Sequence, residues 1–157
     1  MRVRNTGLIL FSSLLLGLLA EPAQAQDQTL IFLVRHAEKV DDGSADPALT
    51  EAGRVRARLL AEMLKDVGLT HVHSSDYLRT RTTAGPAAEA AGLEVTLYDP
   101  RDLGGFATHL LGVPGRHLVV GHSNTNPELV AALGGDPHGT IDDLEYDRLY
   151  LVEWVEG

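Results

Sequence analysis

The chain contains no cysteine among its 157 residues. Without thiols it can neither form a disulfide framework nor carry out thiolate chemistry, and oxidising conditions outside the cytoplasm leave it unaffected. Lysine is almost as scarce, because Lys39 and Lys65 are the only two, so arginine supplies nearly all of the positive charge.

Positive charge is in deficit overall. Lys and Arg number 13 against 22 Asp and Glu, which gives a formal net charge of −9 at pH 7. Binding to a phosphate backbone needs a surplus of cations, so nucleic acid is excluded as the main partner. The proportions of hydrophobic residues, 44%, and charged residues, 22%, are those of a soluble globular protein of one domain, not of a disordered or fibrous chain.

A long hydrophobic run is also missing. The apolar stretch at 7–20 is shorter than the ~20 residues of a membrane-spanning helix, and serine and glycine interrupt it. Two arginines precede it and A-Q-A follows, which is the layout of a secretory signal peptide. We therefore predict a signal peptide at 1–25, cleaved after Ala25, and a secreted or periplasmic domain at 26–157 without stable membrane association. An uncleaved N-terminal anchor is the alternative.

The domain at 26–157 alternates between apolar runs typical of strands and amphipathic stretches typical of helices. Strands are predicted at 30–34, 70–74, 94–97, 117–120 and 148–155, and helices between Thr50 and Gly68 and at 77–91, 102–111 and 126–133. The run at 30–34 is continuously apolar, as in a strand buried on both faces of a parallel sheet. Repeated units of this kind predict an α/β fold with a mostly parallel sheet and helices on both faces.

The first predicted helix is amphipathic. Six apolar side chains recur in it with helical spacing and are expected to face the core: Val55, Leu59, Leu60, Met63, Leu64 and Val67. Arginines at 54, 56 and 58 are expected to lie in water on the other face.

In such a sheet, ligands bind beyond the carboxyl ends of the strands. Arg35 and His36 follow the first predicted strand, and Arg79 lies one helical turn beyond the end of the second. His122 follows the strand at 117–120. One such residue at a strand end is commonly structural, but the topology brings all four to the same edge of the sheet.

The four residue types suit a phosphoryl group. Arginine presents a planar fork of donors that matches phosphate oxygens. A histidine among arginines is driven towards its neutral form, which is a competent nucleophile at phosphorus. A second, protonated histidine can stabilise the charge of the transition state. We expect this chemistry to need neither a metal ion nor another cofactor.

Four segments resemble, in order and spacing, the motifs of the histidine phosphatase superfamily, also called the phosphoglycerate mutase-like fold. They are LVRHAEK at 33–39, DPALTEAG at 46–53, SSDYLRTRTTA at 74–84 and VVGHSNT at 119–125. The R-H-A-E-K variant is common in the small bacterial branch of the family. The resemblance extends over roughly 29–155 and implies a three-layer α/β/α sandwich with a mostly parallel sheet.

Carried over to this chain, the resemblance implies that His36 becomes phosphorylated, that Arg35 and Arg79 bind the phosphoryl oxygens, and that His122 stabilises the transferring group. The predicted function is a metal-independent phosphatase that acts on a phosphorylated small molecule through a phosphohistidine. A non-catalytic domain that binds a phosphorylated ligand is the alternative. A mutase would need a second phosphate site, which the small size disfavours.

The acid that would protonate the leaving group is not evident. Larger family members supply it from an insertion after the third strand, where this chain is short, and Asp99, Asp102 and Glu38 are the candidates. Asp102 also suits the N-cap of the following helix. Without an acid, good leaving groups would be favoured, such as the imidazole of phosphohistidine, on which one small branch of the family acts.

Two further segments carry alternative interpretations. His71 and His73 point to one side of a predicted strand and could form a zinc site with His122 or Asp76, which would make the protein a zinc hydrolase. The segment Glu145–Asp147 precedes the last strand and is interpreted as structural, with pocket lining as the alternative.

Overall fold

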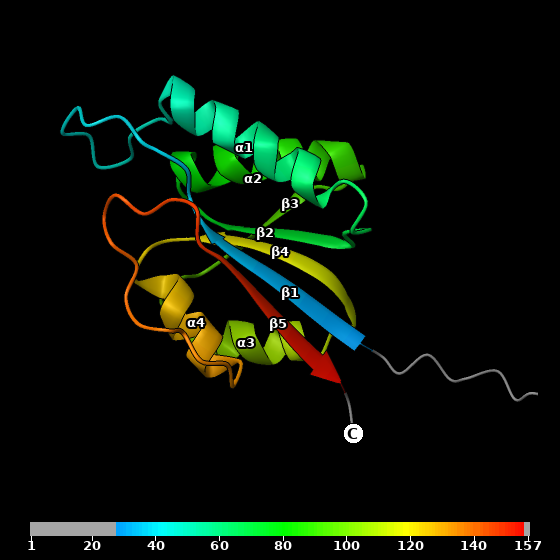
Figure 1. The fold of residues 1–157 in the computed structure, drawn as a ribbon. Helices are drawn as coiled ribbons and strands as arrows, with labels where there is room; N and C mark the ends of the chain where they lie inside the picture. The colour runs from blue at the N-terminus through cyan, green and yellow to red at the C-terminus, as the bar shows by residue number, and fades with distance from the viewer. Residues whose placement is uncertain (1–27, 156–157) are drawn as a thin grey trace, which may run out of the picture.

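The computed structural model describes residues 28–155, which form one sheet between two layers of helices (Figure 1). The strands are β1 (Gln28–Arg35), β2 (His71–Ser75), β3 (Val95–Tyr98), β4 (Gly115–Gly121) and β5 (Leu149–Val155). The helices are α1 (Glu51–Leu64), α2 (Leu78–Ala91), α3 (Leu103–Leu111) and α4 (Thr125–Ala132). The signal peptide predicted at 1–25 lies outside the described residues and stays a prediction.

The sheet has the strand order β3-β2-β4-β1-β5. Its first four strands are parallel, and β5 runs antiparallel to β1 at the edge. Helices α1 and α2 cover one face, and α3 and α4 cover the other (Figure 1). The predicted three-layer α/β/α sandwich with a mostly parallel sheet is therefore confirmed. Among the described helices, none has the length and apolar character needed to cross a membrane.

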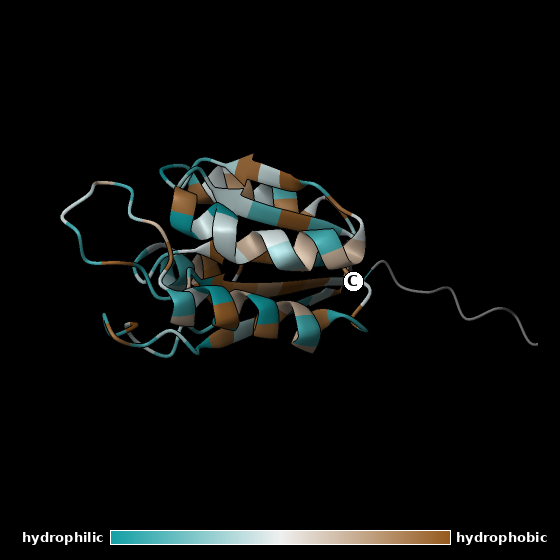
Figure 2. Cartoon of the chain, turned by 90° about the horizontal axis from the view of Figure 1, so that it is seen from above, coloured by the Kyte–Doolittle hydropathy of each residue, from teal (hydrophilic) through white to brown (hydrophobic). Residues whose placement is uncertain are grey.

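Strand β1 contributes to the core on both of its faces, as its continuous apolar run predicts. Ile31 and Leu33 belong to the apolar cluster under α3 and α4, whereas Phe32 and Val34 belong to the cluster under α1 and α2. Figure 2 shows polar and apolar residues mixed along the helices, as expected where only one helical face meets a sheet.

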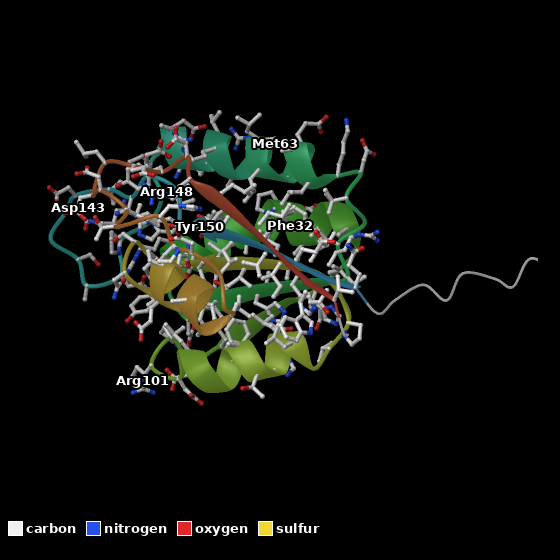
Figure 3. All side chains as sticks on the ribbon, turned by 60° about the horizontal axis from the view of Figure 1, so that its bottom comes forward. Phe32, Met63, Arg101, Asp143, Arg148 and Tyr150 are labelled. Carbon is white, nitrogen blue, oxygen red and sulfur yellow. The ribbon has the colours of Figure 1, made fainter. Side chains whose placement is uncertain are left out.

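The prediction of which α1 side chains face the core is wrong in part. Leu60 and Leu64 are buried, but Val55, Leu59 and Met63 are exposed by 50%, 55% and 64%, and Figure 3 labels Met63 on this helix. The helix instead buries a stripe of small side chains that includes Gly53, Ala57 and Ala61, with the same helical spacing.

Glycine is required at position 53 because a Cβ there would lie 2.3 Å from the carbonyl oxygen of Glu38. The small stripe thus lets α1 approach the chain that follows β1. Val55, Leu59 and Met63 each lie two residues from a member of this small stripe, and two residues turn an α-helix by about 200°, so these three side chains point away from the core.

A stack of three histidines lies on the neighbouring strands β2 and β4, on the face of the sheet that contacts Phe106 of α3. The ring centroids of His71 and His117 lie 4.4 Å apart, and His73 and His117 are 2% and 0% exposed. Because His117 Nε2 donates to the carbonyl of Val113 at 2.8 Å, its Nδ1 accepts from His73 Nε2 at 3.1 Å. Within residues 28–155, no group of three or more potential ligands is arranged to hold a metal ion.

Burial lowers the pKa of His73 from 6.5 to about 3, and it also lowers the pKa of His117. Below pH 6.5 the unfolded chain therefore binds protons that the folded protein does not, so stability falls with falling pH. We expect the free energy of unfolding to decrease from pH 6.5 towards pH 4, with His73 contributing at most about 1.4 kcal/mol per pH unit.

Denaturant unfolding measured at several pH values checks this. The variant His73→Gln cannot titrate and should show a shallower loss of stability below pH 6.5 than the parent protein. Above pH 7 the slopes of the two proteins should agree. Equal slopes below pH 6.5 would contradict the assignment of a buried neutral His73.

Candidate active site

Three neighbouring strands deliver the predicted site residues to one end of the sheet. Arg35 at the end of β1 pairs with Gly121 at the end of β4, and the His36 N–H donates to the Gly121 carbonyl at 2.9 Å. On the other side of β4, β2 ends at Ser75. A pocket of about 390 Å³ lies beyond these ends, and its lining includes all four predicted residues, Arg35, His36, Arg79 and His122, together with Lys39 and Arg101.

His36 is held with one ring nitrogen free. Its Nδ1 lies 2.8 Å from the carbonyl oxygen of Ala37, and since a carbonyl only accepts, Nδ1 carries the proton. The Ala37 N–H in turn donates to Thr83 Oγ1 at 2.9 Å, which ties this turn of the chain to α2. In the neutral ring, Nε2 then carries the lone pair of a nucleophile.

The surroundings of His36 maintain that neutral form. His36 is only 3% exposed to solvent. Burial lowers the pKa of His36 from 6.5 to about 4, and the positive charges of Arg35, Arg79 and Lys39 act in the same direction.

A chain of hydroxyl groups determines the proton position on His122. The Thr80 hydroxyl donates to the carbonyl of Ser75 at 2.8 Å, so it can only accept from the Ser75 hydroxyl at 3.1 Å. Ser75 has then used its own proton, and its oxygen, 2.9 Å from His122 Nε2, must accept from that nitrogen. Nε2 is therefore protonated, and Nδ1 is the ring nitrogen left for a ligand.

His122 lies close to His36, with ring centroids 5.5 Å apart. Burial, together with Arg79, His36 and Arg35, lowers the pKa of His122 from 6.5 to about 4, although the nearby charge of Asp46 acts in the opposite direction. Both histidines are consequently neutral at pH 7 in the absence of an anion. A bound dianion would favour protonation of His122 by direct attraction.

Arg35 is buried and oriented by backbone. Its Nη1 donates to the carbonyls of Asp142, Asp143 and Glu145 at 2.8, 3.0 and 3.0 Å, and its guanidinium lies 4.5 Å from the centroid of the Tyr146 ring. The segment Glu145–Asp147 thus supports Arg35, as its structural interpretation predicts.

Arg79 is oriented by Tyr77, the N-cap residue of α2, and by Asp46 from a distant loop. Its guanidinium lies 4.4 Å from the centroid of the Tyr77 ring, and its Nη1 lies 3.4 Å from Asp46 Oδ1. The Asp46 carboxylate also accepts from the Leu78 N–H at 2.9 Å, at the start of α2. Among the described residues, the buried Nε atoms of Arg79 and Arg35 have no acceptor, which suits both arginines to an anionic ligand.

The three candidate acids make other contacts. Asp99 binds Arg101 through both carboxylate oxygens, Asp102 accepts from the Gly105 N–H as the N-cap of α3, and Glu38 binds Arg56 at 2.7 Å. None of the described residues that line the pocket is an aspartate or glutamate. The pocket therefore combines several cations with two neutral histidines and suits a tetrahedral oxyanion.

Sequence reasoning missed several supporting residues. Ser75 and Thr80 lie within the segment singled out after the second strand, so the hydroxyl chain had a local signal. Asp46 and Tyr146 reach the site from loops distant in sequence. Both lie in segments singled out above, the motif at 46–53 and the segment Glu145–Asp147, but nothing in those segments indicated a contact with Arg79 or Arg35. The proposed zinc partners His73 and His122 do not share a hydrogen-bond network, since His73 binds His117 and His122 binds Ser75.

Comparison with known sequences gives one family. Residues 31–100 match the model of the histidine phosphatase superfamily (branch 1). The protein named "Probable phosphoglycerate mutase GpmB" from Erwinia tasmaniensis is 43% identical over 77 residues, which is 45% of this chain and 35% of that protein. The corresponding protein from Serratia proteamaculans is 44% identical over the same length. The match thus spans about a third of these curated relatives.

Solved structures extend the likeness over most of the chain. A mycobacterial glucosyl-3-phosphoglycerate phosphatase, Rv2419c, has a TM-score of 0.65 at 18% identity, covering 80% of this chain and 90% of that one. The protein histidine phosphatase SixA complexed with tungstate has a TM-score of 0.61 at 25% identity, covering 69% and 80%. Residues 31–100 thus match the histidine phosphatase superfamily in sequence, and the described domain shares the fold of solved phosphatases of that kind.

Proposed function

We propose that the protein is a metal-independent phosphatase that works through a phosphohistidine on His36. The observation that carries this proposal is the hydrogen bond from His36 Nδ1 to the Ala37 carbonyl, which leaves Nε2 unprotonated in a pocket of cations. Members of the superfamily include phosphatases and proteins named as mutases. The predicted signal peptide supports action outside the cytoplasm, on a phosphorylated small molecule.

The proposed reaction has two displacements at phosphorus. Nε2 of His36 forms a bond to phosphorus as the bond to the leaving group breaks, and the leaving group departs with the bonding electron pair. Water then attacks the phosphohistidine, the P–N bond breaks, and inorganic phosphate is released. Arg35 and Arg79 stabilise the phosphoryl oxygens in both steps, and His122, protonated at Nδ1 by the attraction of the dianion, donates to one of them.

The substrate class follows from the lack of an acid among the pocket-lining residues. An alkoxide leaves slowly unless it is protonated, whereas an aryl oxide, a carboxylate or an imidazole leaves readily. We therefore propose substrates with good leaving groups. A mutase would need to hold a second phosphate, and Arg101, which lies at the pocket, is already paired with Asp99.

Phosphate release from an aryl phosphate in excess chelator tests the function directly. The purified protein should release phosphate, and His36→Ala should abolish release because it removes the nitrogen that forms the bond to phosphorus. His138→Ala, at an exposed histidine, is the matched control and should retain activity.

Two other outcomes are informative. If the parent protein binds tungstate but releases no phosphate, the site is that of the non-catalytic alternative. Full activity in His36→Ala would rule out the phosphohistidine mechanism.

Arg79 and Arg81 form a second matched pair. Arg79 lines the pocket, whereas Arg81 lies two residues further along the same helix, on its opposite side, and is paired with Asp76. We expect Arg79→Ala to weaken tungstate binding by about 2–4 kcal/mol, because a charge-assisted contact is lost. This corresponds to a roughly 30- to 1,000-fold rise in Kd. Calorimetry should show Arg81→Ala near the parent value, and an equal loss in both variants would contradict the assignment.

Ser75 and the adjacent Ser74 allow the hydroxyl chain to be tested. Both serines are fully buried, but the Ser74 hydroxyl donates to the Ser75 carbonyl and does not contact His122. Ser75→Ala should lower kcat roughly tenfold with little change in KM, the effect of about one lost hydrogen bond on a residue that acts in the transition state.

The ¹⁵N chemical shifts of His122 give an independent readout. They should report Nε2 protonation in the parent protein and in Ser74→Ala, and a mixture of tautomers in Ser75→Ala. Unchanged shifts in Ser75→Ala would show that the hydroxyl chain does not set the tautomer.

A further inference from the structure

Strand β5 has a free edge. It is seven residues long and pairs only with β1 within the described part of the chain (Figure 1). Its outward backbone N–H and C=O groups therefore have no strand beside them there. An exposed edge of this length is a template for pairing with another strand.

Beside this edge lies an apolar surface that we call the α1–β5 patch. It consists of Val55, Leu59, Met63, Leu149 and Leu151. Leu149 and Leu151 are exposed by 41% and 57%. They pair with Val34 and Phe32 of β1 and therefore lie on the face of the sheet that α1 and α2 cover. A groove of about 230 Å³ joins the two elements, with Leu59, Met63 and Leu149 in its lining. Contiguous exposed apolar surface of this kind marks interaction sites.

We infer that the α1–β5 patch and the β5 edge form a homodimer interface, in which two copies of β5 pair antiparallel about a two-fold axis. An isologous interface places the same surface on both sides, and a strand rotated by 180° about an axis perpendicular to the sheet is antiparallel to itself. The two sheets then continue as one. This inference is independent of the proposed function.

The spacing of the elements favours a second copy over a single added strand. Strands lie about 4.8 Å apart, so the two copies of β1 would be about 14 Å apart across the two β5 strands. Helix α1 packs on β1 through Leu60 and Leu64. Packed helices are separated by about 8–10 Å, so side chains such as Leu59 and Met63 from both copies would fill the remaining space and cover Leu149 and Leu151.

The charges along β5 are compatible with this pairing. Arg148 immediately precedes the strand and pairs with Glu145 of its own chain, and Glu153 lies near the other end and accepts from Gln28. Antiparallel pairing sets opposite ends of β5 side by side, so that neither side chain is placed next to its own copy. This matters because a chain with net charge −9 is otherwise repelled by its own copy.

The opposite edge of the sheet provides a matched control. Strand β3 is only four residues long, and its Leu97 is 50% exposed, close to the 57% of Leu151. Sedimentation velocity over a wide range of concentration should show a dimer for the parent protein and for Leu97→Lys. Leu151→Lys should sediment as a monomer of 16.9 kDa, or less if the signal peptide has been removed.

A parent protein that stays monomeric at every concentration would overturn the inference. The occupant of the patch would then be something other than a second copy, such as residues 1–27 or a different protein. Dissociation by Leu97→Lys with the dimer intact in Leu151→Lys would overturn the inference as well. Circular dichroism confirms that each variant is folded.

Crosslinking gives a test that does not rely on a disruptive charge. The chain has no cysteine, so Leu151→Cys introduces a single thiol. In an antiparallel pair centred near this residue, the two thiols lie within roughly 8 Å of each other, a distance that a short bis-maleimide spans. A covalent dimer is expected from Leu151→Cys and not from Leu97→Cys. Equal crosslinking of both variants, or of neither, would overturn the inference.

Discussion

The parallel pairing of β1 with β4 is the constraint on which the site depends. It sets Arg35 beside Gly121, so that His36 and His122 leave their strands at the same level with rings 5.5 Å apart. The pairing of β4 with β2 then places Ser75 within 2.9 Å of His122. A slip of one residue between β1 and β4 would turn the side chains at the end of one strand to the opposite face and separate the histidines.

The electrostatics of the pocket follow from how its charges are held. Arg35 is only 6% exposed, and the backbone carbonyls and aromatic ring around it replace part of its lost hydration without neutralising its charge. Burial, reinforced by the positive charges of Arg35 and Arg79, lowers the pKa of both histidines and keeps them neutral until an anion binds. Asp99, Asp102 and Glu38 are meanwhile engaged away from the pocket. An acidic protein can therefore present a site selective for anions, because local geometry outweighs net charge at contact distance.

The sequence was sufficient for the fold and for the convergence of Arg35, His36, Arg79 and His122, because one topological rule applies to every strand end in a parallel sheet. Loop residues such as Asp46 and Tyr146 could not be found this way, since no periodicity predicts how a loop folds back. The error on α1 has a different origin. Two stripes there share the helical spacing, and hydropathy alone favours the larger side chains. Steric fit decides otherwise, because only glycine at position 53 can approach the Glu38 carbonyl.

That steric choice also links the surface of the molecule to its site. Thr50 donates its N–H to the Glu38 carbonyl at 2.8 Å, and its hydroxyl accepts from the Gly53 N–H, so the start of α1 supports the chain two residues beyond His36. Close approach on this side needs the small residues to face inward, and Leu59 and Met63 then necessarily face outward. The exposed patch is thus a consequence of the close packing of α1 against the segment that follows His36. A partner that covers the patch would stabilise α1 and, through Gly53 and Glu38, the segment that holds His36.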